Sequence, residues 1–158
     1  MIFFLVVSFL IVIFDQITKV LITRSLALYE SVSIIKGLFS FTYVQNRGAA
    51  FGILQGARVF FVIITIALLI FVVGYIIRKK PQNLLEKTAI SFITGGALGN
   101  FIDRAYLGYV RDFISTDFID FPVFNVADCF VCIGAALYVI FVLCEGKQNG
   151  NNKTDSAQ

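Results

Sequence analysis

Aspartates gather in one stretch of this sequence, and their type and spacing suit acid–base chemistry. Of ten acidic residues in the chain, five lie between positions 103 and 128. The chain has no histidine, which excludes Ser-His-Asp and Cys-His catalysis and any metal site held by histidine. Two carboxylates that meet in a poorly solvated site cannot both ionise easily, so one keeps a proton. Such a pair can hydrolyse an amide, because the ionised member takes a proton from water while the protonated member donates to the scissile carbonyl.

Asp128 is the acid that we expect to lie deepest in an apolar segment. If that segment begins near Phe121, Asp128 lies about seven residues along it, on the order of 10 Å from its start. An ionisable group at such a depth is costly and indicates a functional site. The alternative is a structural ion pair with Arg104 or Arg111. Asn125 precedes Asp128 by three positions, so both side chains would share one helical face.

Asp112 is the second candidate for such a pair. The apolar residues Phe113 and Ile114 follow it, which indicates that its segment returns to the membrane surface. That return would bring Asp112 beside Asp128. Taken alone, however, the position favours a solvated loop acid.

Other polar positions have structural interpretations. Asp15 and Lys19 form an i, i+4 pair with the acid on the N-terminal side, which favours an ion pair that fixes the first helix. Residues 46–52 form a glycine-containing turn, for which a plain loop is the simplest interpretation. The cysteines are interpreted as small buried side chains without a metal, because their apolar segment offers no further zinc ligand. They are Cys129, Cys132 and Cys144.

The elements that must position these acids are membrane helices. Of the 158 residues, 58% are hydrophobic, and the mean hydropathy of +0.87 implies more apolar surface than a soluble domain of this size buries. Residues 59–77 are 19 consecutive uncharged positions, the length that a bilayer core requires. The predicted spans lie at about 2–21, 59–77, 84–102 and 121–143.

Basic residues predict the orientation of these spans. The short loop between the second and third spans contains Arg78, Lys79, Lys80 and Lys87, a density that is typical of cytoplasmic loops. Both termini would then lie in the cytoplasm, while residues 22–58 and 103–120 would face outward. Aromatic and polar residues alternate at 39–43, which indicates a strand. We therefore expect a small sheet on the outer membrane surface within the outer β segment 22–58.

The predicted fold class is thus an all-α polytopic membrane protein. It has four transmembrane helices and a small extracytoplasmic β-sheet between helices one and two. Residues 1–145 would form a single domain, and residues 146–158 a polar cytoplasmic tail. In the third span, small residues would let neighbouring helices approach closely; they are Gly95, Gly96 and Gly99.

Five blocks of this sequence resemble the bacterial lipoprotein signal peptidases, also called type II signal peptidases. They occur in that family's order and cover nearly the whole chain before the tail. The blocks are 15–19 (DQITK), 46–52 (NRGAAFG), 95–104 (GGALGNFIDR), 110–114 (VRDFI) and 124–128 (FNVAD). One position departs from the pattern, because the residue after the second aspartate is often serine in the family and is Cys129 here.

The resemblance implies an aspartic endopeptidase without metal or cofactor. It would remove the signal peptide from diacylglyceryl-modified prolipoproteins, cutting just before the lipid-bearing cysteine of the substrate. Asp112 and Asp128 would be its catalytic dyad, near the outer face of the bacterial cytoplasmic (inner) membrane. Other matching positions would bind substrate or support the site, and they are Asn46, Gly48, Asn100, Arg104, Asn125, Asp15, Lys19 and Asp103.

The expected partners are therefore prolipoprotein substrates and membrane lipids, with no nucleic acid, and we expect a monomer. Two other classes stay open at this point. A small transporter could use Asp128 and Asp15 as proton or ion sites, although transporters typically place such groups at the midplane and show repeated halves. A non-enzymatic assembly protein could use the polar cluster only to join helices.

Overall fold

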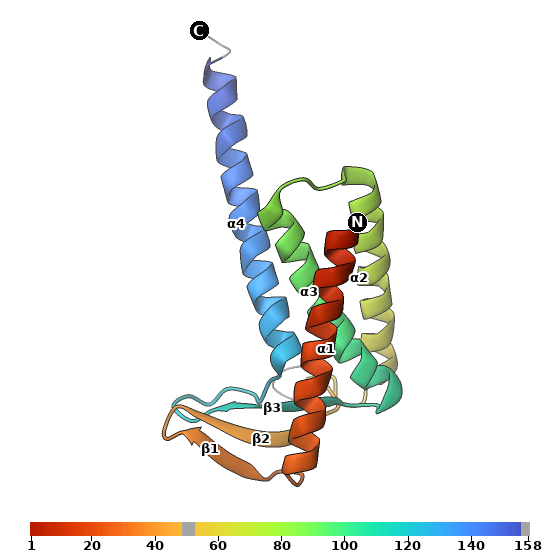
Figure 1. Cartoon of the computed structure of the whole chain (residues 1–158), viewed down its shortest axis with the longest axis vertical. Coiled ribbons are helices and arrows are strands. Elements are labelled where there is room, and N and C mark those ends of the chain that lie inside the picture. Colours follow the sequence, from red (N-terminus) through yellow and green to blue (C-terminus); the bar gives the residue numbers. More distant parts are fainter. Residues whose placement is uncertain (49–52, 156–158) are drawn as a thin grey trace.

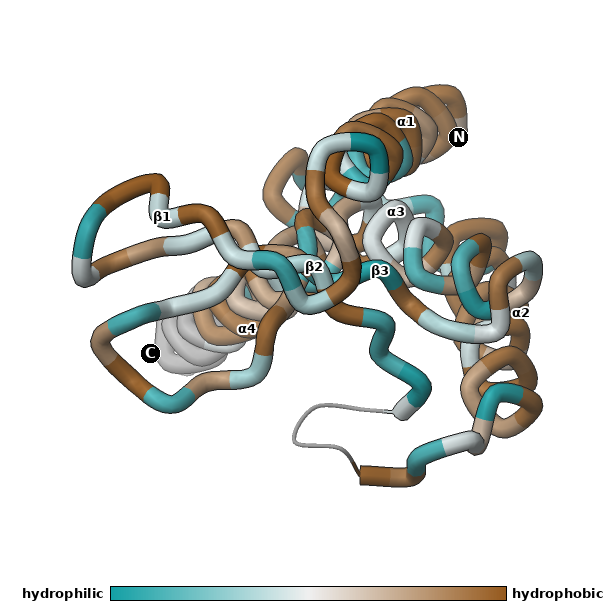
Figure 2. The backbone as a smooth tube through the Cα atoms, turned by 90° about the horizontal axis from the view of Figure 1, so that it is seen from below, coloured by the Kyte–Doolittle hydropathy of each residue, from teal (hydrophilic) through white to brown (hydrophobic). Residues whose placement is uncertain are grey.

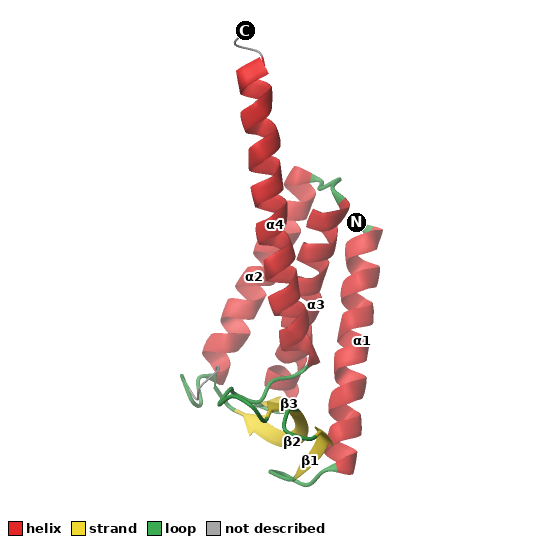
Figure 3. Cartoon of the chain, turned by 90° about the vertical axis from the view of Figure 1, so that its left-hand side faces the viewer, coloured by secondary structure: helices red, strands yellow, loops and turns green. Residues whose placement is uncertain are grey.

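The computed structural model describes residues 1–48 and 53–155. Within them, four helices stand side by side and a three-stranded sheet lies across one end of the bundle (Figure 1). The view in Figure 3 agrees, with the sheet at one end and α4 extending beyond the other helices at the opposite end. The helices are α1 (Ile2–Ser25), α2 (Arg58–Lys79), α3 (Leu84–Tyr106) and α4 (Val126–Asp155). The strands are β1 (Ser31–Ile35), β2 (Phe39–Asn46) and β3 (Val110–Thr116).

Three of the described helices are long and apolar enough to cross a membrane. They are α1, α2 and the part of α4 from Val126 to Gly146, and Figure 2 shows α1 and α2 mostly in the hydrophobic colour. The helix α3 has 23 residues but carries charged residues near both ends, such as Glu86 and Asp103. The helices α1 and α3 continue to Ser25 and Tyr106, past their predicted ends at 21 and 102.

The helix α3 is the centre of the bundle and packs against α1, α2 and α4. Its close approach to neighbours depends on the predicted glycines, Gly95, Gly96 and Gly99. A Cβ at Gly99 would lie 2.5 Å from Asp15 Oδ2, and one at Gly96 would overlap the carbonyl oxygen of Ala127. The prediction that these glycines bring helices together is confirmed, and the contacts they allow are with the elements that carry the acids.

The sheet is antiparallel, in the order β1-β2-β3. The predicted strand within 22–58 is present as β2, and β1 pairs with it. The third strand, β3, lies between α3 and α4 in the sequence. The prediction, which placed the whole sheet between helices one and two, therefore missed this strand. Pairing of Val44 with Asp112 and of Asn46 with Val110 brings the end of β2 beside the aspartate. Buried Ile22 and Phe113 belong to one small apolar core, which joins the sheet to the end of α1.

The predicted start of the fourth span is wrong. Helix α4 begins at Val126 rather than near Phe121, because Phe124 is held in an extended bridge by two backbone hydrogen bonds with Ile114, of 2.7 and 3.0 Å. Asp128 therefore lies in the first turn of α4, not about seven residues along it. That turn is closed by a reciprocal cap. The backbone amide of Asp128 donates to Asn125 Oδ1 at 3.0 Å, and the backbone amide of Asn125 donates to Asp128 Oδ2 at 3.2 Å.

Candidate active site

Asp112 and Asp128 reach one pocket from two different elements. Asp112 lies on β3, Asp128 lies on the first turn of α4, and both line a cavity of about 460 Å³. A second cavity of about 750 Å³ shares Asp112 and Asn46 with the first. Asp112 is only 2% exposed. The two acids that the sequence singled out therefore do meet, with a space beside them for a ligand.

Three asparagines hold the two carboxyl groups in place. Asp112 accepts hydrogen bonds from Asn46 Nδ2 at 2.9 Å and from Asn125 Nδ2 at 2.6 Å. Asp128 accepts one from Asn100 Nδ2 at 2.7 Å. Asn125 Nδ2 also donates to Asn100 Oδ1 at 3.0 Å. The carboxyls are thus joined through a continuous chain of side-chain amides, which fixes their orientation without placing a positive charge beside either of them.

The environment of Asp112 favours its protonated form. Burial, together with the nearby charge of Asp128, raises the pKa of Asp112 from its usual 3.8 to about 7. Hydrogen bonds from Asn46 and Asn125 act in the opposite direction but do not cancel the rise. A carboxyl that still holds a proton near neutral pH can act as a general acid.

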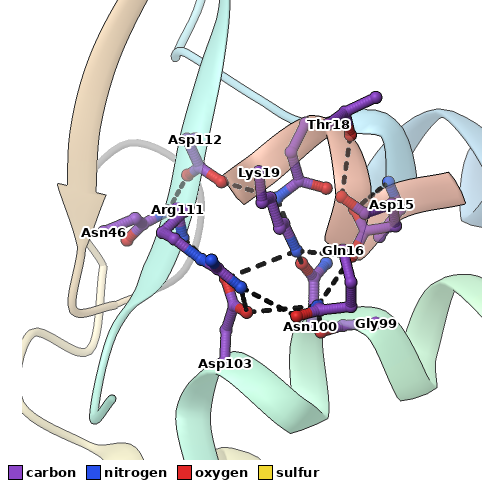
Figure 4. A network of polar contacts seen from close by, with 12 residues as sticks. Asp15, Gln16, Thr18, Lys19, Asn46, Gly99, Asn100, Asp103, Arg111 and Asp112 are labelled. Carbon is purple, nitrogen blue, oxygen red and sulfur yellow. Dashed lines mark hydrogen bonds and ion pairs between the residues drawn. The ribbon is translucent and has the colours of Figure 1, made fainter. Parts of the chain in front are cut away.

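Lys19 occupies the centre of a second polar layer, with Asp15, Asn100 and Asp103 around it (Figure 4). Its side chain has no exposed surface, and its Nζ lies 2.9 Å from Asp15 Oδ2 and 3.5 Å from Asp103 Oδ2. It also donates to Asn100 Oδ1 at 3.0 Å. Asp15 in turn accepts the backbone amide of Ala127 at 3.0 Å, which connects α1 to the N-terminal turn of α4. The predicted Asp15–Lys19 ion pair is confirmed.

Two members of this layer were not among the predicted site residues, Gln16 and Arg111. Arg111 binds Asp103 through its backbone amide at 3.0 Å and its guanidinium at 2.6 and 3.1 Å. Gln16 Oε1 accepts from Arg111 at 2.8 Å, and its amide donates to Asp15 and Asp103 at 3.1 and 3.2 Å. The alternative that Arg111 pairs with Asp128 is therefore wrong. Both residues lie within the blocks that mark the family, which was the available signal.

Arg104 lies at the wall of the pocket. Its guanidinium carbon sits 4.7 Å from the centroid of the Phe61 ring, and one of its nitrogens donates to the Gly48 carbonyl at 3.4 Å. The Gly48 amide donates to Asn46 Oδ1 at 2.9 Å. Within residues 1–48 and 53–146, no ion pair joins Arg104 to either aspartate. The rest of the predicted block, 49–52, lies outside the described residues.

Hydrogen bonds and ion pairs thus connect all ten predicted site residues into one network. The cysteines are not members of this network. Cys129 and Cys132 line the pocket that holds the two aspartates, and both Cys132 and Cys144 are exposed in the isolated chain. The interpretation of all three as buried side chains is therefore wrong, because Cys132 and Cys144 lie at exposed positions of α4 and Cys129 is only half-buried. In the described part of the chain, no group of three or more acids and cysteines could hold a metal ion.

The sequence matches a known family of peptidases. The family model for signal peptidase (SPase) II matches residues 7–144. Lipoprotein signal peptidase of Clostridium novyi is 42% identical over 139 residues, which cover 86% of this chain and 94% of that protein. The Staphylococcus aureus lipoprotein signal peptidase is 42% identical over 151 residues, covering 94% and 91%.

Solved structures agree with the sequence relatives. A bacterial membrane enzyme determined by the in meso method at 2.3 Å superposes with a TM-score of 0.87 and 41% identity, over 92% of this chain and 90% of that one. A second, at 1.9 Å, gives a TM-score of 0.82 and 43% identity, over 89% and 92%. The chain belongs to the signal peptidase II family of aspartic peptidases. Membership in an enzyme family sets aside the transporter and the assembly protein.

Proposed function

We propose that Asp112 and Asp128 are the catalytic dyad of this aspartic peptidase, and that its substrates are diacylglyceryl-modified prolipoproteins, cut just before the lipid-bearing cysteine. Removal of signal peptides from prolipoproteins is the activity of the family to which the chain belongs. The observation that carries the proposal is the pair of carboxyls in one pocket, bridged by asparagine amides.

The two carboxyls differ in a way that suits amide hydrolysis. Asp128 lies at the start of α4, where the helix dipole favours a negative charge, and Asp112 holds its proton up to about pH 7. Asp128 would take a proton from water as the oxygen attacks the scissile carbonyl carbon, while Asp112 donates its proton to the carbonyl oxygen. In the second step Asp128 would pass its proton to the leaving nitrogen, and Asp112 would recover one as the carbonyl re-forms.

A cleavage assay tests the proposed substrate. Purified chain in lipid vesicles is incubated with a prepropeptide that carries a diacylglyceryl cysteine, and mass spectrometry identifies the fragments. We expect one cut on the N-terminal side of the modified cysteine. The matched control is the same peptide without the diacylglyceryl group, which should stay intact. Equal cleavage of both peptides would show that the lipid is not recognised.

Arg104→Lys should lower the rate of cleavage about 10- to 100-fold. The planar guanidinium stacks at 4.7 Å on Phe61 and still reaches the Gly48 carbonyl, whereas an ammonium group keeps the charge but cannot do both. We propose that this arrangement presents the guanidinium to the substrate carbonyl region beside the dyad. The measurement is kcat/KM in the same assay, with Arg58→Lys as the control. Normal turnover by Arg104→Lys would reduce Arg104 to a source of positive charge.

The rate of cleavage should fall as the pH rises through about 7. Burial raises the pKa of Asp112 to about 7, so the acid form that the mechanism requires is present below that value and is lost above it. The expected slope is about tenfold per pH unit well above 7. A profile of kcat/KM between pH 5 and 9 measures it. A rate that stays constant up to pH 9 would mean that Asp112 does not act as the acid.

We also propose that α3 is a fourth transmembrane helix, shielded by the other three, and that the sheet and the dyad lie at the outer face of the bacterial inner membrane. The packing of α3 against α1, α2 and α4 supports the first point. The basic loop between α2 and α3 lies at the end of the bundle opposite the sheet, which supports the second. Residues 1–145 would act as one monomeric domain, with both termini cytoplasmic.

Cysteine labelling tests this orientation. On a background in which all three native cysteines are replaced, Lys36→Cys in the exposed turn between β1 and β2 should react with an impermeant thiol reagent in intact cells. Gln82→Cys, in the exposed loop between α2 and α3, should react only after the membrane is opened. The reverse pattern would overturn the proposed orientation.

A further inference from the structure

A groove between α1 and α2, closed by α3, has no part in the chemistry described above. Its apolar pocket has a volume of about 530 Å³ and is lined by residues such as Phe9 on α1, Val73 on α2 and Leu98 on α3. Its lining shares no residue with the two cavities that hold Asp112. We call it the α1–α2 groove, and it needs its own explanation.

The α1–α2 groove leads to two basic side chains. A further pocket of about 450 Å³ shares Phe4 and Ile76 with it and is lined by Lys80 and Lys87. In the described part of the chain, neither ammonium group is in an ion pair. Lys80 lies in the loop between α2 and α3 and Lys87 near the start of α3, at the end of the bundle opposite the sheet. An apolar channel that ends in two unpaired cations is complementary to a molecule with an apolar chain and an anionic head.

The length of the groove indicates which molecule that is. Together the two pockets run along α1 from Met1 to Val12, which is about 17 Å at the helical rise per residue. One leaflet of a bilayer has a hydrocarbon depth of about 15 Å, half of the roughly 30 Å that a transmembrane helix must span. Along α1, the groove therefore matches the depth that a lipid acyl chain occupies in one leaflet.

We propose that the α1–α2 groove binds an anionic phospholipid from the leaflet at the end opposite the sheet. One acyl chain lies in the apolar pocket, and the phosphate lies between Lys80 and Lys87. Each lysine close to an anionic head group favours binding about five-fold, so the two distinguish an anionic lipid from a zwitterionic one with the same chains. This site lies apart from the dyad and does not depend on the proposed peptidase mechanism.

The absence of tryptophan from the chain gives a direct test by fluorescence. Phe9→Trp puts a single indole in the groove at a position where the native ring is 64% exposed. The variant is placed in vesicles of phosphatidylcholine and phosphatidylglycerol with the same acyl chains, and only one of the two lipids carries bromine. Quenching of the indole then reports which lipid lies in the groove. We expect brominated phosphatidylglycerol to quench more strongly than its share of the vesicle predicts.

Matched variants separate a specific site from general attraction to the membrane. Lys80→Gln with Lys87→Gln should remove the preference for phosphatidylglycerol. Arg78→Gln removes one charge from the same end of α2 but lines neither pocket, so it should keep the preference. A reporter at Phe71→Trp, 69% exposed and outside the groove, should show no preference.

Three results would overturn the proposal. Equal quenching by the two lipids at Phe9→Trp would show that the groove does not select an anionic head. A preference that survives loss of both lysines would assign it to another surface. Quenching that falls as the protein-to-lipid ratio rises, with either lipid brominated, would identify a second copy of the chain as the occupant. Because the readout involves no cleavage, Asp128→Asn should show the same lipid preference, which keeps this test independent of the peptidase.

Discussion

Replacing either Asp112 or Asp128 by Asn should abolish cleavage, with a fall in rate of at least about 10³- to 10⁴-fold. Asn keeps nearly the same shape, so each variant should remain folded and inserted. It cannot cycle a proton, however, and the relay between water, substrate carbonyl and leaving nitrogen needs a proton at both positions. The measurement is the rate of cleavage of the lipidated prepropeptide, alongside the yield of folded protein.

The double variant and one control make this expectation specific. Asp112→Asn combined with Asp128→Asn should be no less active than either single variant, because residues that act as a unit are not additive. Asp117→Asn is the matched control, since Asp117 follows β3 and accepts a hydrogen bond from Ser40 Oγ at 2.8 Å, which an amide oxygen can also accept. If Asp117→Asn were inactive and Asp112→Asn active, the second carboxylate would have been assigned to the wrong residue.

Much of the architecture follows from sequence pattern because membrane helices and basic loops have strong signals. The 19 uncharged residues at 59–77 require a helix in the bilayer, and α2 is found there. The start of α4 was missed because apolar residues such as Phe121 were counted into the span. The better signal was the spacing of Asn125 and Asp128, which fits a reciprocal helix cap and is used as one.

The connections inside the site were much less predictable. The hydropathy pattern predicts that an acid in an apolar segment has a polar partner, but it does not identify that partner. Arg111 is adjacent to Asp112 in sequence and turns away from it to bind Asp103, because successive residues of a strand point to opposite faces. The third strand was also missed. It forms because it pairs with β2, which is distant in the sequence, and its own residues do not alternate between apolar and polar types.

Lys19 shows how the two polar layers depend on each other. It contacts two carboxylates from different helices, Asp15 on α1 and Asp103 on α3. It also fixes Asn100, whose amide nitrogen holds Asp128. The dyad therefore rests on a buried cation that touches neither of its members. A buried charge with partners on both sides is costly to remove, because the groups left behind lose their compensation.

Lys19→Met should therefore lower the free energy of unfolding by about 3–5 kcal/mol. Met fills most of the space of the fully buried Lys19 side chain, but it leaves Asp15 without its cation, whereas Asp103 keeps Arg111. Adding Asp15→Asn should recover a large part of the loss, because an amide oxygen can still accept the hydrogen bond from the backbone amide of Ala127 without carrying a charge.

Denaturant titration in detergent measures the free energy of unfolding of each variant. The control, Lys36→Met in an exposed turn, should change this free energy by less than about 0.5 kcal/mol. A Lys19→Met protein as stable as the parent, or a double variant less stable than the single one, would show that the Lys19–Asp15 pair does not support the bundle.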